Sequence, residues 1–211
     1  ISMLDLKAFQ KITYGVYLVS SRCGDISSGC VVNTLTQVTT SPAQVTIAIN
    51  KQNYTTEIIR KSGRFTAVVL SQSAMMELIG RFGFHCSRDT EKFESFRTRV
   101  DESGVPFVCE QASARFSCKV VSSMDAGTHI IFLGEVEAAE VLDSTGPMSY
   151  AYYHQIKNGV TPPRASVYQP EPAKGYRCRI CGYVLDSDTV PDDFVCPICG
   201  RGKEHLEKIT G

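Results

Sequence analysis

The segment from Cys178 to Gly200 reads CRICGYVLDSDTVPDDFVCPICG and contains two Cys-x2-Cys pairs, Cys178 with Cys181 and Cys196 with Cys199. Fourteen residues separate the two pairs, and this spacing suits one tetrahedral metal rather than disulfides. A glycine follows each pair, at a position where a sharp turn can aim backbone amides at thiolate sulfur. Four thiolates suit iron or zinc about equally well on ligand softness alone, so the spacing predicts the site and leaves the metal open.

Proline marks the boundary between this tail and the rest of the chain. Residues 158–175 contain four of the nine prolines, Pro162, Pro163, Pro170 and Pro172. Because proline fixes φ and removes a hydrogen-bond donor, the segment predicts a semi-rigid linker between a main domain, 3–157, and a tail, 176–211. We expect Met3 to be the natural start. A tail this short needs a metal to fold.

Charge and hydropathy exclude several classes of protein. The 211 residues include 22 basic and 22 acidic side chains, so there is no overall field to attract nucleic acid or an anionic membrane. No apolar run is long enough to span a bilayer, and the first residues lack the pattern of a signal peptide. We therefore expect a cytoplasmic protein that binds neither nucleic acid nor membranes. The five cysteines outside the tail should be reduced thiols.

The main domain is rich in β-branched residues. Strands are predicted at 16–21, 29–35, 44–50, 64–71, 114–121 and 129–142. Helical spacing of apolar residues occurs at 4–12, 55–63 and 74–82, with Gly63 and Gly83 as expected helix ends. Since strands outnumber helices and do not alternate with them, we expect a mainly β fold, an antiparallel barrel covered by helices.

Two polar segments of the main domain are candidates for cofactor binding. Neither the G-x-G-x-x-G dinucleotide fingerprint nor a P-loop is present. Residues 50–56 leave a predicted strand and enter a predicted helix, which places Lys51 and free amides at a helix N-terminus suited to phosphate. Residues 33–41 supply amides and hydroxyls that could bond the pyrimidine edge of a flavin. The alternatives are that Asn53 is a helix N-cap and that the Thr-rich segment is a solvated sheet face.

Several segments of the main domain, taken in order, resemble the flavin reductase-like, FMN-binding split-barrel family over about residues 4–157. They include GCVVNTLTQVTTSP, NKQNYTTEIIRKSGRFTAVVLS, GRFGF and PMSYAYYHQIK. The resemblance implies a split β-barrel and a homodimer that holds FMN near the subunit interface and is reduced by NADH or NADPH. The implied flavin contacts are Asn33, Thr34, Gln37 and Thr39 beside the ring, Asn50, Lys51, Asn53, Thr55 and Thr56 near the phosphate, and Phe82 and Lys92 as contributors.

Two histidines are candidates for catalytic roles. His129 stands where members of the family often have Gly-Asp-His, but the sequence here is Gly-Thr-His, without the acid. His154 lies in the aromatic stretch YAYYHQ and is a second candidate to line the site. For each of them, a hydrogen-bonded core histidine is the alternative.

The tail resembles rubredoxin, through CxxCGYV and VPDDFVCPICG. That family binds one redox-active iron through four cysteines and transfers single electrons. The short spacing between the pairs is closer to the rubredoxin-like tails of rubrerythrins, and Phe194 stands where rubredoxins commonly have tryptophan. A structural zinc ribbon is the alternative, and zinc can also replace iron in such a site.

The combination of a flavin domain with a rubredoxin-like tail resembles the high-molecular-weight rubredoxins. It implies an NAD(P)H-dependent oxidoreductase that passes electrons through FMN to one iron per chain, and on to a partner such as a flavodiiron reductase. One alternative is a flavin reductase with a structural zinc ribbon. The other is an electron carrier similar to flavoredoxin that does not use NAD(P)H directly.

Overall fold

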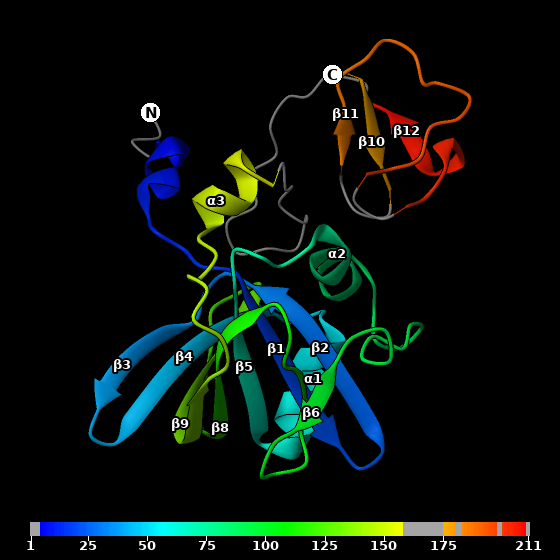
Figure 1. Ribbon diagram of the computed structural model, residues 1–211. Helices are drawn as coiled ribbons and strands as arrows, with labels where there is room; N and C mark the ends of the chain where they lie inside the picture. Colours follow the sequence, from blue (N-terminus) through cyan, green and yellow to red (C-terminus); the bar gives the residue numbers. More distant parts are fainter. Residues whose placement is uncertain (1–4, 158–174, 180–182, 198–199, 210–211) are drawn as a thin grey trace.

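The computed structural model describes residues 5–157, 175–179, 183–197 and 200–209 (Figure 1). Within these ranges, seven strands form the main sheet in the order β2-β1-β5-β8-β9-β4-β3, with antiparallel neighbours throughout. Their bounds are β1 Tyr17–Cys23, β2 Ile26–Val32, β3 Thr36–Thr40, β4 Ala43–Asn50, β5 Arg64–Leu70, β8 Ala112–Asp125 and β9 His129–Val141. A separate two-stranded ribbon consists of β6 Thr98–Val100 and β7 Pro106–Val108.

The main sheet curls until its ends approach each other. β2 is the first strand in the order and β4 the sixth, yet Thr34, just beyond β2, contacts Ala48 of β4. The Thr34 hydroxyl donates to the Ala48 carbonyl oxygen at 3.0 Å and lies 3.1 Å from the Ala48 amide nitrogen. No strand ladder joins β2 to β4 among the described residues. The sheet is therefore a barrel split along one side.

Three α-helices and a 3-10 helix are described in the main domain, η1 Leu6–Lys11, α1 Tyr54–Ser62, α2 Met76–Phe84 and α3 Tyr150–Gln155. α1 begins at Asn53, whose side-chain oxygen accepts the Thr55 amide at 3.0 Å. It ends at Gly63, which adopts φ 68°, a conformation that glycine takes without the steric cost of a Cβ. α2 crosses the open end of the barrel and buries Leu78, Ile79 and Phe82.

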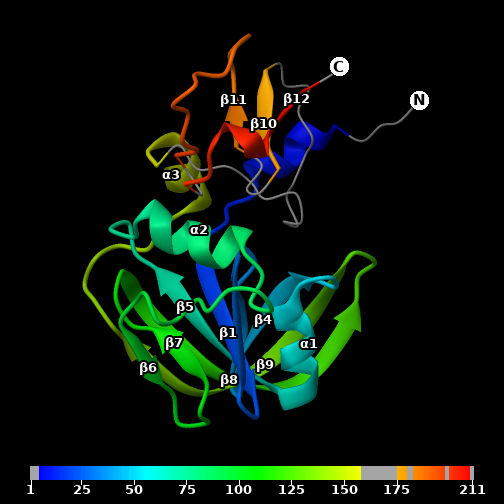
Figure 2. The ribbon, with the colours of Figure 1, turned by 90° about the vertical axis from the view of Figure 1, so that its right-hand side faces the viewer.

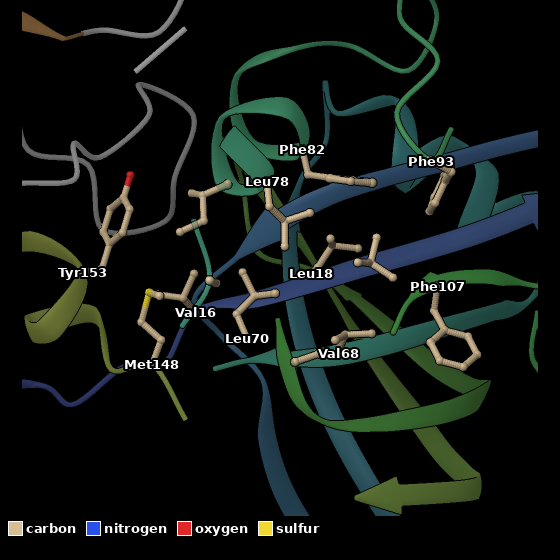
Figure 3. Close-up of a cluster of buried hydrophobic side chains, with 14 residues drawn as sticks. Val16, Leu18, Val68, Leu70, Leu78, Phe82, Phe93, Phe107, Met148 and Tyr153 are labelled. Atoms are coloured by element: carbon tan, nitrogen blue, oxygen red, sulfur yellow. The ribbon is translucent and has the colours of Figure 1, made fainter. Parts of the chain in front are cut away.

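Two apolar clusters form the core of the main domain. One packs α2 against β1 and β5, with Tyr153 and Met148 at one end and Phe93 and Phe107 at the other (Figure 3). The other fills the barrel and includes Ile47, Ile49, Ile59, Phe65 and Phe132, all at most 2% exposed. Each fully buried side chain of this size contributes roughly 1.5 to 3 kcal/mol to folding.

The tail contains a small three-stranded sheet in the order β11-β10-β12. Its elements are β10 Tyr176–Cys178, β11 Val184–Leu185, the 3-10 helix η2 Lys203–His205 and β12 Leu206–Lys208. In both views the tail lies over α2, at the open end of the barrel (Figures 1 and 2). Among the described residues, no helix has the length and apolar character needed to cross a bilayer.

The predicted mainly β fold is confirmed, and all six predicted strands are present with ends shifted by up to a few residues. The expectation that Gly83 ends a helix was wrong, because α2 continues to Phe84 and its capping residue is His85. In the segment predicted as helical at 4–12, Leu6–Lys11 form a short 3-10 helix. β3 and α3 were not predicted as elements, and residues 36–40 form a mostly exposed strand, the solvated face that was the alternative for this segment.

Candidate functional site

A pocket opens where α2, α3 and the ends of β2 and β4 meet. It contains about 700 Å³ of empty space, a volume that includes open solvent at its mouth. Most of its wall is apolar, and amide side chains and one histidine lie at one side. The described residues that line it are Val16, Val31, Val32, Asn33, Ala48, Ile49, Asn50, Asn53, Ile79, Gly83, Phe84, His129, Tyr150 and Tyr153.

The polar side of the pocket lies at the N-terminus of α1. Asn50 ends β4 and faces His129, the first residue of β9, across the strand pair. Asn53 is both the N-cap of α1 and a lining residue, so the capping alternative and the predicted site role describe the same side chain. A helix N-terminus favours anionic groups, and this one lies beside the amides of Asn50 and Asn53. The arrangement therefore fits a ligand with an apolar ring system and a phosphate.

The threonine hydroxyls that were predicted near the phosphate form hydrogen bonds within the protein. Thr55 and Thr56 are at most 1% exposed. The Thr55 hydroxyl lies 2.9 Å from that of Ser28, and the Thr56 hydroxyl donates to the Asn50 carbonyl oxygen at 2.8 Å. Thr56 therefore holds the turn between β4 and α1, whereas Thr55 ties the start of α1 to β2. Lys51, on the same turn, forms an ion pair with Asp125 at 2.5 Å.

The residues predicted beside the flavin ring are divided between two places. Asn33 is 8% exposed and lines the pocket, and Thr34 closes the barrel through Ala48. Gln37 and Thr39 lie on β3, an edge strand, outside the pocket lining within the described part of the chain. The exposure of β3 explains this separation, because an edge strand has no neighbouring strand on its outer side.

Phe82 and Lys92 lie behind the pocket wall and are not among its described lining residues. Phe82 packs edge-on against Phe93 in the core. The Lys92 ammonium is buried and donates to the carbonyl oxygens of Gly29 at 2.8 Å and Phe82 at 3.3 Å. Burial lowers the pKa of Lys92 to about 8. Burial also raises the pKa of the neighbouring Cys30 thiol, which disfavours the thiolate that a nucleophile would need.

The two candidate histidines differ in position. His129 lines the pocket, and its Nδ1 lies 2.9 Å from the Thr128 hydroxyl. His154 packs edge-on against Tyr150, with ring centroids 4.5 Å apart, on α3. Sequence reasoning missed Tyr150 and Tyr153 as lining residues, although their i, i+3 spacing places them on one face of a helix. It also missed Phe84, and Gly83, which was expected only to end a helix.

The first cysteine of each pair lies within the described residues, and the two have matching backbone hydrogen bonds. The Cys178 amide donates to the Tyr183 carbonyl oxygen at 2.8 Å, and the Cys196 amide donates to the Arg201 carbonyl oxygen at 2.7 Å. In each case the two bonded residues are five positions apart, so the first cysteine of each pair has the same backbone hydrogen bond. Cys181 and Cys199 lie outside the described residues, and no group of three metal-binding side chains occurs within the described ones.

Cys178 and Cys196 are each 1% exposed and belong to one apolar cluster. A thiol donor set of two matched pairs fits a single soft metal.

Comparison with known proteins gives matches in both parts of the chain. The model of the family described as flavin reductase like domain matches residues 9–159, and that of the rubrerythrin, rubredoxin-like domain matches residues 176–207. A high molecular weight rubredoxin from Moorella thermoacetica is 37% identical, over 98% of this chain and 100% of its own length. A ferric-chelate reductase (NAD(P)H) from Archaeoglobus fulgidus is 42% identical, over 78% of this chain and 98% of its own.

Solved structures share the fold of the main domain. An NADH:FAD oxidoreductase from Streptomyces globisporus superimposes with a TM-score of 0.63 at 24% identity, and the match covers 71% of this chain and 92% of that one. A flavoredoxin from Methanosarcina acetivorans superimposes with a TM-score of 0.57 at 21% identity, covering 64% and 74% of the two chains.

Proposed function

Because this chain belongs to the flavin reductase-like family and has the two-domain organisation of the high molecular weight rubredoxins, we propose that it is an oxidoreductase that transfers electrons from NAD(P)H through FMN to a four-cysteine iron and on to a partner redox protein. Membership of these families implies a flavin in the main domain and iron in the tail. We propose in addition that the flavin is FMN, that NAD(P)H reduces it, and that the acceptor is a partner redox protein.

The observation that carries the proposal is the pocket at the N-terminus of α1. Asn33, Asn50 and Asn53 offer amides to this pocket, and Tyr150 and Tyr153 offer aromatic surface. A bound flavin would supply the conversion of a two-electron hydride into single electrons, chemistry that side chains alone do not provide. The protein contributes the apolar wall that excludes water and the amides that orient the ring and phosphate. His129 lies at the polar side, where it can donate or accept a hydrogen bond.

The electron count explains why the two domains belong together. NADH releases two electrons and one proton on becoming NAD⁺, while one four-thiolate iron takes one electron in passing from ferric to ferrous. Oxidation of one NADH therefore reduces two ferric centres and releases one proton. In a homodimer, which we propose as the working unit, the two tails provide these two centres.

An anaerobic titration of the purified full-length protein tests the proposal. The visible spectrum should show a flavin band together with ferric-thiolate absorption, and NADH or NADPH should bleach both. Metal analysis should give about one iron per chain, as a four-cysteine site requires. If the flavin bleaches and the tail holds only zinc after expression in iron-replete medium, the tail has no electron-transfer role. If a chemically reduced partner bleaches both centres while neither nicotinamide does, the protein is an electron carrier similar to flavoredoxin.

A second function is favoured by the ferric-chelate reductase relative. That protein aligns over 98% of its own length with only 78% of this chain, so its length corresponds to the main domain. The main domain here could therefore reduce a small acceptor without the tail. Reduction of ferric chelates at an equal rate when the tail lacks metal would favour this second function.

The downstream partner that we propose is a flavodiiron-type reductase. In the tail, Asp186 and Asp188 follow β11 and are exposed to a partner, whereas Asp192 pairs with Lys203 at 2.5 Å. Analytical ultracentrifugation tests the homodimer, and reduction of a purified flavodiiron protein by NADH, with and without this chain, tests the partner.

A further inference from the structure

Phe84 belongs to two sites at once. It is the last residue of α2 and lines the pocket of the main domain. It also packs against the apolar cluster of the tail that contains Cys178 and Cys196. One half-buried aromatic ring therefore touches both the proposed flavin site and the proposed metal site.

Met76, at the other end of α2, also contacts the tail. It packs against the same cysteine cluster and against the core of the main domain, but it is not among the described residues that line the pocket. We call Met76 and Phe84 the α2 platform. Figures 1 and 2 both show the tail above α2, so the contact is not an effect of one viewing direction.

The composition of α2 is unusual for a helix on the surface of a single domain. Leu78, Ile79 and Phe82 already fill its core-facing side and are at most 2% exposed. A surface helix with a buried stripe normally presents polar residues elsewhere. The α2 platform instead presents a thioether and an aromatic ring, side chains that are enriched where proteins contact each other.

The tail offers a matching apolar surface. Tyr183, Phe194 and Leu206 pack around the two cysteines, and the rings of Tyr183 and Phe194 stack at 6.4 Å between centroids. The surroundings of a metal–thiolate site control its exposure to water and thereby its potential. Met76 and Phe84 extend this apolar shell from the main domain.

We infer that the α2 platform docks the tail over the pocket mouth, and that Phe84 is the positioning residue through which the pocket and the cysteine site are held in contact. The inference rests on the proposed electron-transfer function. Docking at this place brings the two sites together for transfer of one electron, in which the metal centre passes from ferric to ferrous and no bond forms or breaks.

Docking can be measured without flavin or electron transfer. The full-length protein is loaded with zinc, and the rotational correlation time of the tail amides is obtained from ¹⁵N relaxation. In the natural sequence the tail should tumble with the main domain. In Met76→Ala and in Phe84→Ala the tail amides should relax as a faster, tethered unit, whereas Phe84→Leu, which keeps an apolar side chain, should restore most of the docked behaviour.

Met75→Ala is the matched control for the helix. Met75 is adjacent to Met76, is 55% exposed and lies in neither the pocket lining nor the cysteine cluster among the described residues. Its substitution should leave the tail docked. A tail that tumbles independently in the natural sequence, or one that stays docked in both Met76→Ala and Phe84→Ala, would overturn the inference.

A second experiment measures electron transfer in the iron-loaded protein. Weaker docking should slow NADH-driven iron bleaching in Met76→Ala by roughly tenfold, the change expected from loss of one buried contact. Flavin bleaching should keep its rate. Equal iron bleaching in the natural sequence and in a Met76→Ala protein whose tail tumbles independently would overturn the inference. Failure of the proposed function is recognised separately, because the natural sequence would then show no iron bleaching at all while the relaxation measurement still reports docking.

Discussion

The ammonium of Lys92 lies 2.8 Å from the carbonyl oxygen of Gly29, inside the protein and behind the pocket wall. A second carbonyl, that of Phe82, accepts from the same ammonium at 3.3 Å. A Cβ at Gly29 would lie 2.9 Å from the Phe82 ring, so any larger residue there would force this ring to shift. Lys92 therefore ties β2 to α2, the two elements that form one wall of the pocket.

Lys92 should make folding stability depend on pH. Burial lowers its pKa from 10.5 to about 8, so between these values the unfolded chain binds more protons than the folded one. The free energy of unfolding must therefore rise with pH across this window. Relative to Lys92→Met, the natural sequence should gain about 1 kcal/mol between pH 8 and pH 9, measured by urea denaturation.

The pH range in which stability rises is limited at its upper end by the titration of buried cysteines. Burial raises the pKa of Cys30, and it raises that of Cys118 to about 12, above the usual value of 9.0. These thiols bind protons in the folded state that the unfolded chain releases, so they reduce stability as the pH rises above about 9. Both proteins share the loss at Cys118, whereas the Lys92 charge lowers the pKa of Cys30, so the two proteins are compared only up to pH 9. A constant difference from pH 7.5 to 9 would contradict the prediction.

Gly83→Ala should weaken flavin binding and at the same time raise the stability of the main domain. A Cβ at Gly83 would meet only the Val31 side chain, at 3.7 Å, an ordinary contact between two residues that line the pocket. Replacing glycine by alanine inside a helix stabilises by roughly 0.5 to 1 kcal/mol, so the melting temperature should rise. The added methyl narrows the pocket, so the flavin dissociation constant should increase by about fivefold or more, equivalent to about 1 kcal/mol. Equilibrium dialysis against FMN measures it, and unchanged affinity would exclude Gly83 from the flavin wall.

The sequence predicts the framework of this protein better than its pocket. The branched segments and the cap at Asn53 are local signals, and the structure confirms the strands and the capped helix they predict. Tyr150 and Tyr153 reach the pocket because α3 folds back near the end of the main domain, a long-range packing that no local pattern reports. Resemblance to a family indicated Thr55 and Thr56, and the structure shows the Thr55 hydroxyl bonded to Ser28 of β2 and the Thr56 hydroxyl bonded to Asn50 in the turn that precedes α1.

The contact between tail and main domain lies further beyond sequence reasoning. Phe84 reads as the last apolar residue of a helix, and nothing next to it in the chain indicates that the cysteines about a hundred positions later pack on it. The spacing of the cysteines predicts a metal site but does not indicate where it lies relative to the barrel. Only the packing of α2 shows where the tail lies.

Gly134→Ala should destabilise the barrel without touching the pocket. A Cβ at Gly134 would lie 2.6 Å from the Phe65 ring and 2.9 Å from the Cβ of Cys118, closer than real Cβ atoms approach. Overpacking of this kind costs roughly 1 to 3 kcal/mol, which urea denaturation measures. Phe65→Leu in the same chain removes the ring and should recover part of the loss. A double variant less stable than both single ones would contradict this steric account.

Cys196→Ser should remove the metal and unfold the tail while the main domain stays intact. In the described part of the tail, the apolar cluster around Cys178 and Cys196 has only Tyr183, Phe194 and Leu206 from the tail itself, which is too little to stabilise so short a chain without a metal. Metal content should fall from about one per chain to well below half, because a serine hydroxyl is a poor ligand for a soft metal. Trypsin should then cleave the tail rapidly, whereas flavin content and the main thermal transition should be retained. Cys86→Ser, at an exposed cysteine of the main domain, is the matched control and should keep the metal. Full metal content in Cys196→Ser would show that this cysteine is not a ligand, and loss of flavin would show that the main domain depends on the tail for its fold.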